Sequence, residues 1–557
     1  MLFRIRHILL LLGTAPLAFS ATLLAQSANC SVAQPHPLTE EQQAVIRGDL
    51  TGAETLYRQK IAQQPKDPEL TGGLVRTLLA EEKVDQAEST VKAALAAAPQ
   101  SVELLTALAE VQYRQGVPWD EERTLAAAEK TNLCYARLHL VFAQYYQFNS
   151  YYATALAKIK LAHQLDPYDP DIRRSWMPTL PLKQRIEELK AYLATNDTDV
   201  DARRHAQRQL VLLEDRQENR SKSCHLASSV AATDIPFTAI MADANTIRGW
   251  GLEVFFNDHK SRLQVDTGAS GLYISRPVAE RAGLKPITRS EASGIGNKGG
   301  QSGYIAYADS IKIGGLEFKD CLVEVSDRRN VVDTEGLIGM DVFSNFLVAL
   351  DFPWHKLTLE PLPPYPGTTA VPPMLNTHEE SPSDESDAAA TSTKDAEDTK
   401  AAPAPRGPHD RYIAPQMKNW TSVYRVGHNM IVPTALNNKR MRLFIIDTGA
   451  FRTSISPSAA REVTSVHSDP RGTVHGISGS VANVYTGDRI VFRFAHLQQE
   501  KDNVLSFDTS QISKGTGTEI SGFIGFDLLG LLVVKIDYRD GLMSFEYSAD
   551  RGYQHIR

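Results

Sequence analysis

One short pattern occurs twice in this chain and strongly limits the folds that the chain can adopt. Residues 263–275 read LQVDTGASGLYIS, and residues 443–456 read LFIIDTGAFRTSIS. The acid of the first copy is Asp266 and that of the second is Asp447, an offset of 181 in the numbering. In both copies a short apolar run ends on an acid and is followed by Thr, Gly and Ala, which predicts a buried strand that runs into a tight turn.

Two further patterns recur at nearly the same offset. The glycine turn at Gly294 returns at Gly476, an offset of 182. The run GLIGMDVFSNFLVALDF, which begins at Gly336, returns as GFIGFDLLGLLVVKIDY from Gly522, an offset of 186. Three patterns at nearly one offset would not arise from a chance tripeptide, so the sequence predicts an internal duplication.

The surrounding composition predicts where the two copies begin and end. Residues 236–364 and 412–548 alternate apolar and polar residues between glycine-rich turns, which is typical of β domains. The segment 366–411 between them is acidic and rich in Ala, Ser, Thr and Pro. Such a composition cannot bury enough apolar surface to order itself, so we expect a disordered acidic linker there.

Residues 38–215 differ from the β segments in composition and periodicity. They are rich in Ala, Leu, Gln and Glu and have helical periodicity. Prolines follow offsets of 34 and 68, and small residues keep the same phase within the helices: Pro65, Pro99, Pro167, and Ala53, Ala87, Ala155. This 34-residue period resembles the tetratricopeptide repeat. The resemblance implies a helical solenoid that binds a protein partner; an ordinary helical bundle is the alternative.

The N-terminus and the bulk composition bear on location. Residues 1–27 combine Arg4 and Arg6 with the apolar run ILLLLGTAPLAF, as a signal peptide does. An uncleaved membrane anchor is the alternative. We therefore expect an exported bacterial protein, periplasmic or extracellular, with no stable membrane span after signal removal. The net charge of −7 and the pI near 6.1 argue against a nucleic-acid partner.

Cysteines and histidines predict neither a disulfide framework nor a metal site. Cys30, Cys134, Cys224 and Cys321 lie far apart and show no CxxC or Cys/His ligand spacing, so buried or free thiols are expected. No histidine pair has the spacing of metal ligands. We expect no metal and no cofactor.

Together the duplicated motifs resemble a known family. Two apolar residues, then Asp-Thr-Gly-Ala, a glycine turn, and two apolar residues with Gly before a short helix are similar to the retropepsin-like aspartic peptidases, in particular to tandem bacterial aspartyl-protease domains. The resemblance implies a multidomain α + β chain, in which a helical repeat solenoid precedes two closed β-barrel domains.

The resemblance also implies the chemistry. Asp266 and Asp447 would form a dyad in which one carboxylate activates a water and the other acts as the acid. Which residue takes which role stays open, because the titration belongs to the pair. Four neighbours would support the site: Thr267, Gly268, Thr448 and Gly449. Glycine turns would form flaps that contact the substrate: Gly294, Ile295, Gly476 and Ile477.

The residue after each Asp-Thr-Gly bears on the pH range. It is Ala269 in one copy and Ala450 in the other, so neither supplies a hydroxyl that would lower the pKa of the dyad. A pH optimum in the weakly acidic or neutral range is therefore expected.

The predicted function is an exported aspartic endopeptidase whose helical repeats recruit a protein partner or substrate. Two alternatives stay open. The β domains could bind peptides without cutting them, since fold resemblance does not establish turnover. Each β domain could also pair with its twin in a second molecule, which would make separate sites by homodimerisation.

Overall fold

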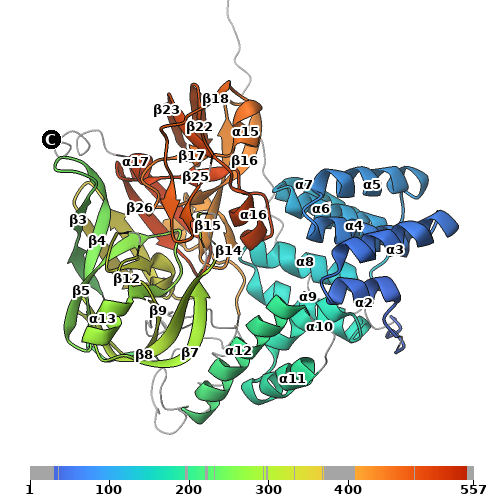
Figure 1. Ribbon diagram of the computed structural model, residues 1–557, viewed down its shortest axis with the longest axis horizontal. Helices are drawn as coiled ribbons and strands as arrows, with labels where there is room; N and C mark the ends of the chain where they lie inside the picture. The colour runs from blue at the N-terminus through green and yellow to red at the C-terminus, as the bar shows by residue number, and fades with distance from the viewer. Residues whose placement is uncertain are drawn as a thin grey trace, which may run out of the picture.

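The computed structural model (Figure 1) shows a helical N-terminal region beside a β-rich C-terminal region. It describes residues 30–35, 37–194, 199–219, 224–230, 232–292, 294–296, 299–331, 333–366, 368, 375, 408–481 and 483–547. The proposed signal segment 1–27 and most of the predicted linker 366–411 lie outside these residues.

The helical region consists of successive short helices. Their bounds are α2 Glu40–Ile46, α3 Leu50–Gln63, α4 Pro68–Ala80, α5 Val84–Ala97, α6 Val102–Arg114, α7 Pro118–Thr131, α8 Ala136–Phe148, α9 Tyr152–Leu165, α10 Pro170–Trp176, α11 Leu182–Ala194 and α12 Val200–Glu218.

The period of the prolines and alanines corresponds to pairs of these helices. Pro65, Pro99 and Pro167 lie in the turns after α3, α5 and α9. The next helix often starts with a side-chain cap; Asp67, for example, accepts hydrogen bonds from the backbone N–H groups of Glu69 and Leu70. The small residues of the same phase are fully buried where helices cross: Ala53, Ala87 and Ala155. The predicted period is therefore confirmed.

The first lobe, residues 233–361, is built from strands with two short helical turns. They are β2 Thr233–Pro236, β3 Thr238–Met241, β4 Ile247–Phe256, β5 His259–Asp266, β6 Leu272–Ser275, α13 Arg276–Arg281, β7 Lys285–Ala292, β8 Gln301–Ile313, β9 Leu316–Ser326, β10 Gly336–Gly339, η3 Met340–Phe343, β11 Phe346–Asp351 and β12 Lys356–Pro361. The short strand β1 (His225–Leu226) pairs with β9.

The second lobe, residues 421–547, has a similar order with more and shorter strands and one added helix. Its elements are β13 Thr421–Ser422, β14 Tyr424–Val426, β15 Asn429–Leu436, β16 Arg440–Ile446, β17 Ser454–Ile455, α15 Pro457–Arg461, β18 Val466–Ser468, β19 His475–Gly476, β20 Gly479–Ser480, β21 Val484–Gly487, β22 Ile490–Phe494, β23 Leu497–Lys501, β24 Val504–Phe507, α16 Ser510–Thr516, β25 Gly522–Ile524, α17 Phe526–Leu529, β26 Leu532–Asp537 and β27 Leu542–Tyr547. A 3₁₀ turn, η5 Pro415–Met417, precedes it.

The strand pairings confirm the internal duplication. In the first lobe β10 lies between β5, to which it is parallel, and β6, to which it is antiparallel. In the second lobe β25 lies in the same way between β16 and β17. The two copies therefore share topology as well as sequence pattern.

A sheet of six strands joins the two lobes. Its order is β13-β27-β26-β11-β12-β2, so each lobe contributes three strands. The central pair is β11 with β26, antiparallel, with Ala349 opposite Lys535. Because β26 is the copy of β11, the two lobes meet in a pseudo-twofold arrangement within one chain.

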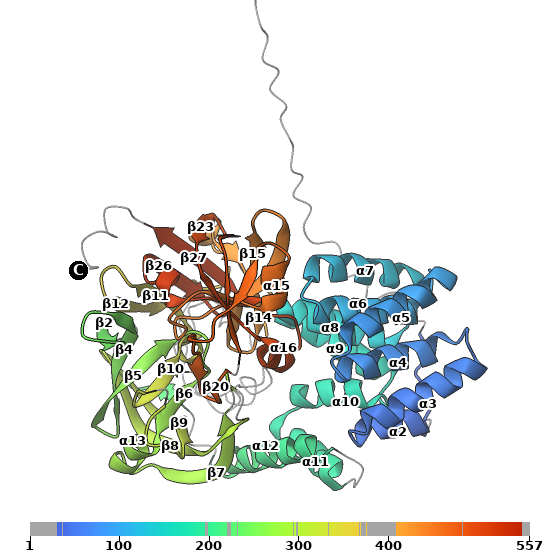
Figure 2. The same cartoon turned by 45° about the horizontal axis from the view of Figure 1, so that its top comes forward.

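The helical region packs on both lobes, as two views agree (Figures 1 and 2). The ring of Phe148 in α8 stacks on Tyr424 of the second lobe, with 4.6 Å between centroids. The hydroxyl of Thr518 donates to the carbonyl of Tyr113 in α6 at 2.6 Å. On the other side α12 lies along β7 of the first lobe.

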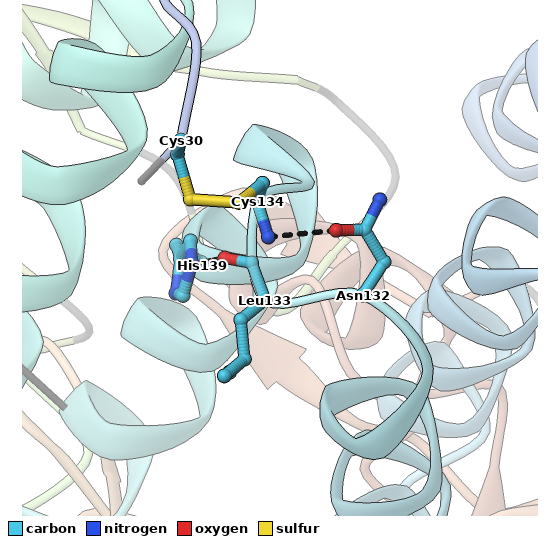
Figure 3. The surroundings of a disulfide bond; sticks show 5 residues. All are labelled: Cys30, Asn132, Leu133, Cys134 and His139. Carbon is cyan, nitrogen blue, oxygen red and sulfur yellow. Dashed lines mark hydrogen bonds between the residues drawn. A yellow bond between two sulfur atoms is a disulfide. The ribbon is translucent and has the colours of Figure 1, made fainter. Parts of the chain in front are cut away.

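The expectation of free or buried thiols is wrong, because the cysteines form two disulfides. Cys30 pairs with Cys134 across 104 residues, as Figure 3 shows, and Cys224 pairs with Cys321 across 97 residues. Cys134 lies in the turn between α7 and α8, where its N–H donates to the side chain of Asn132. Such long loops leave no spacing signal in the sequence, since only the folded chain brings the sulfur atoms together.

Within the described ranges, no helix combines the length and the apolar character needed to cross a bilayer.

Candidate active site

The two acids of the duplicated motif face each other between the lobes. Asp266 is the last residue of β5, and Asp447 directly follows β16. A Cβ atom added to Gly268 would lie 2.7 Å from Cγ of Asp447, and one added to Gly449 would lie 2.4 Å from Cγ of Asp266. Each glycine thus leaves the space that the opposite carboxyl group occupies.

The two threonines link the acid loops across the lobe interface. The N–H of Thr267 donates to Oγ1 of Thr448 at 3.0 Å, and the N–H of Thr448 donates to Oγ1 of Thr267 at 3.0 Å. The hydroxyl of Thr267 donates to the carbonyl of Ile446, and that of Thr448 donates to the carbonyl of Val265. Both threonines are buried, so these four hydrogen bonds hold the carboxyl groups in register.

Burial raises the pKa of both acids. Desolvation raises the pKa of Asp266 well above its usual range, and the charge of Asp447 raises it further. Desolvation also raises the pKa of Asp447, while backbone N–H donors oppose this shift. The N–H groups of Gly449 and Ala450 both donate to Oδ1 of Asp447 at 2.9 Å. The site therefore holds two carboxyl groups that cannot easily ionise together.

The predicted flap residues meet above the acid loops. The N–H of Gly294 donates to the hydroxyl of Ser478 at 3.1 Å, and the N–H of Ser478 donates to the carbonyl of Ile295 at 3.0 Å. A Cβ on Gly476 would lie 2.4 Å from that carbonyl oxygen, so the turns touch closely. Ile477 belongs to the second turn and lies 3.4 Å from the Cβ position of Gly294.

Each flap isoleucine packs toward the opposite lobe. Ile295 joins an apolar cluster of the second lobe that includes Ala450, the residue after its Asp-Thr-Gly. Ile477 joins a cluster of the first lobe that includes Ala269 and Tyr273. The flap tips thus cross over and cover the apolar surface beside the two acids.

Comparison with known proteins gives matches for two parts of the chain. Residues 252–345 match the family model described as gag-polyprotein putative aspartyl protease, and residues 44–116 match a tetratricopeptide repeat model. The chain contains a retropepsin-like aspartyl-protease domain and tetratricopeptide repeats. The matched part of the first lobe includes Asp266 and the first flap.

A curated relative agrees with the first of these assignments. The DNA damage-inducible protein 1 of Chaetomium globosum is 31% identical over 124 residues, which are 22% of this chain and 27% of that protein. The similarity therefore spans little more than a quarter of the length of this curated relative.

Two solved structures are similar to parts of the chain. A thermophilic TPR protein of Thermus thermophilus is 26% identical, with a TM-score of 0.25, over 31% of this chain and 95% of its own. A retropepsin-like aspartic protease of Rickettsia conorii is 23% identical, with a TM-score of 0.17, over 25% of this chain and 92% of its own.

A second pair of acids supports the loops of the retropepsin-like domain and of its copy. Asp341 accepts hydrogen bonds from the N–H of Gly271 and the hydroxyl of Ser270, both at 2.9 Å. In the second lobe Asp527 accepts from the N–H and the hydroxyl of Thr453. Asp341 and Asp527 occupy the same position in the two runs that begin at Gly336 and Gly522, and each holds the loop after the Asp-Thr-Gly motif of its own lobe.

His428 is a site residue that sequence reasoning missed. Its Nε2 contacts the carbonyl of Gly268 at 3.1 Å, and because a carbonyl only accepts, this nitrogen carries the proton. Gln264 of the first lobe likewise donates a side-chain N–H to the carbonyl of Gly449 in the second lobe, at 3.5 Å. By the strand pairings of the two hairpins, the equivalent position of the first copy is Arg248, so the duplication gave no signal for His428.

No group of His, Cys, Asp and Glu side chains with the geometry of a metal site occurs among the residues that the structure describes.

Proposed function

We propose that the chain is an aspartic endopeptidase with one active site, which its own two lobes form together. The observation that carries this proposal is the contact between Asp266 and Asp447, each against the glycine of the other loop. The six-stranded sheet that joins the lobes supports a site made within one chain rather than by homodimerisation.

In this proposal each lobe is one retropepsin-like domain folded as a small barrel. The domains extend over residues 236–364 and 412–548, after helical repeats at 38–215. The strands of the first sheet follow the order β9-β6-β10-β5-β4-β8, and β8 pairs with β9 again. The sheet thus returns to its own start, which supports the barrel. The second lobe has the same strand pairings as the first, and this supports a second domain of the same kind there.

The dyad would share one proton and activate a water between its two carboxyl groups. Asp447, whose Oδ1 accepts two backbone N–H groups, is better stabilised as the anion and serves as the base. Asp266 then carries the proton and donates it to the oxygen of the scissile carbonyl. As the tetrahedral intermediate collapses, Asp447 passes the proton taken from the water to the leaving nitrogen and the C–N bond breaks. One hydroxyl of the intermediate returns its proton to Asp266, which restores the starting state of the pair.

We also propose that the protein is exported to the periplasm or the outside of a bacterial cell after removal of residues 1–27. Two disulfides support this location, because such bonds persist in oxidising compartments. The tetratricopeptide repeats would recruit a protein partner or substrate.

Cleavage of a diverse peptide mixture from pH 3 to 8 tests the proposal. The wild type is compared with Asp266→Asn and Asp447→Asn, and with Asp309→Asn as a control on an exposed residue of β8. One shared site predicts that each dyad variant alone abolishes cleavage, while Asp309→Asn keeps it. Activity that survives both single changes but not the double change would favour homodimeric sites. No cleavage by the wild type would favour a peptide-binding protein.

A further inference from the structure

An open pocket of about 750 Å³ lies between α12 and the hairpin that carries the first flap. Arginines contribute most of its charge: Arg204 and Arg208 come from α12, Arg289 from β7 and Arg328 from the segment after β9. Glu291 is the one acid in its lining. The helical region and the retropepsin-like domain therefore build a basic pocket together.

The arginines are only weakly neutralised. The closest approach of Arg208 to Glu291 is 3.9 Å, and their side chains are 30% and 42% exposed. Arg204 pairs with Asp201 on an exposed helix face, and Arg289 shares Asp327 with another arginine. Ion pairs of this exposed kind stabilise little. For Arg328 no ion pair occurs within the described part of the chain, so its guanidinium can bind an incoming anion.

The position of the pocket relates it to the active site. Ser290 and Glu291 on β7, and Gln301 on β8, line the pocket and form the stem of the flap hairpin. The flap tip at Gly294 begins three residues beyond Glu291, which is a span of about 10 Å in extended backbone. An extended peptide that passes under this flap would bring residues several positions from the scissile bond to the pocket.

We propose that this pocket binds an acidic segment of the polypeptide substrate, several residues away from the scissile bond. This inference rests on the proposed peptidase function. Arginine suits the role because its planar guanidinium binds a carboxylate through two parallel hydrogen bonds. In this arrangement α12 takes part in substrate recognition, and the helical region contributes to specificity from within the same chain.

Binding is measured first, without turnover, on the full-length Asp266→Asn protein. The probes are fluorescein-labelled Ala-Glu-Glu-Ala-Asp-Ala and the matched peptide Ala-Gln-Gln-Ala-Asn-Ala, followed by fluorescence anisotropy. We expect the acidic peptide to bind at least tenfold more tightly, with an affinity that falls as salt is added. Equal binding of the two peptides would overturn the site.

Two double variants assign the binding to the pocket. Arg204→Gln with Arg208→Gln changes one wall, and Arg289→Gln with Arg328→Gln changes the other, so a folding defect of either variant leaves the second to decide. Each should weaken the acidic peptide at least tenfold. Arg123→Gln with Arg493→Gln removes the same charge from exposed positions elsewhere and should change affinity less than twofold. Equal losses in the control would show non-specific charge attraction and overturn the proposal.

The active protein then decides whether the bound segment belongs to a substrate. A peptide that the wild type cuts is extended at either end with the acidic or the amide sequence. The acidic form should have at least a fivefold lower KM at one end, and the Arg204→Gln/Arg208→Gln protein should lose this difference. Binding without any effect on kcat/KM would overturn the substrate assignment. If no peptide is cut at all, the peptidase function fails, whereas the anisotropy result still decides whether the pocket binds acidic peptides.

Discussion

At the scale of single residues, the proposed chemistry depends on two four-residue loops with the same sequence, Asp-Thr-Gly-Ala. Each residue in these loops has a separate physical role. The acids face each other, the threonines bond across the interface, and the glycines leave room for the opposite carboxyl group. The alanines end the motif without a hydroxyl and support apolar flap residues instead.

The raised pKa values of Asp266 and Asp447 give an expected pH range for the proposed activity. One shared proton is needed, and raised pKa values keep the singly protonated pair populated to higher pH. We expect maximal kcat/KM in the weakly acidic to neutral range, measured from pH 3 to 8. Ala450→Ser adds a hydroxyl donor and should shift the acidic limb to lower pH. An optimum below about pH 3 in the wild type would contradict this expectation.

The close approach at the glycines gives a second prediction. Gly268→Ala or Gly449→Ala places a methyl group within 3 Å of the opposite carboxyl group. The displaced dyad should lose activity by about 100-fold or more, because misplacement by 1 Å can cost that much. Gly515→Ala is the matched control, since nothing lies within 4 Å of its Cβ position. Peptide cleavage and thermal unfolding are measured together; full activity of Gly268→Ala would contradict the geometry.

At the scale of elements, equivalent positions in the repeats show where the sequence departs from its own pattern. The buried Ala53, Ala87 and Ala155 keep one phase, and the matching position in α7 is Glu121. This carboxyl group is fully buried, and its oxygens have no hydrogen-bond partner within the described residues. Burial raises its pKa well above the usual range.

Glu121→Gln should therefore stabilise the protein at neutral pH. Because the folded-state pKa is raised, the wild type has its full stability below the unfolded pKa and loses it as pH rises through the folded value. Glutamine keeps the shape but cannot ionise, so the variant should gain about 1–3 kcal/mol over the wild type at high pH. Thermal unfolding at pH 4.5 and 8 measures this. A difference in melting temperature that does not grow with pH would contradict it.

At the scale of the whole molecule, the helical region is part of the same folded body as the lobes. Phe148 of α8 and Tyr113 of α6 lie in one apolar cluster with Ile445 and Phe523 of the second lobe. The same cluster includes Ile295 of the first flap. Packing therefore continues from the repeats to the surface beside the proposed dyad.

Truncation of Phe148 tests this contact. Phe148→Ala removes the ring that stacks on Tyr424 and should cost about 3–5 kcal/mol of stability. Hydrogen exchange should become faster in β14 and β15 of the second lobe as well as in α8. Phe142→Ala is the control, because Phe142 packs within the repeats alone, and should leave β14 and β15 protected. Faster exchange confined to the helices in Phe148→Ala would contradict the coupling.

Local patterns in the sequence predict the main parts of the fold and the two acids of the candidate site. The regular spacing of prolines and alanines predicts the helical repeats, and the duplicated Asp-Thr-Gly motif predicts the two β lobes and names Asp266 and Asp447. These signals are readable because local periodicity and turn chemistry follow from neighbouring residues. Asp341 and Asp527 can likewise be recognised as a pair, because they occupy the same position in the two duplicated runs.

Contacts between groups that are far apart in the sequence depend on the folded arrangement of the chain. The disulfides, the contact of His428 with Gly268, and the arginine pocket each join residues from separate parts of the chain. The packing of α12 on β7 and of α8 on the second lobe belongs to the same class. Such contacts depend on how whole elements bury their apolar faces against one another. The local spacing of residues in a single sequence does not predict this packing.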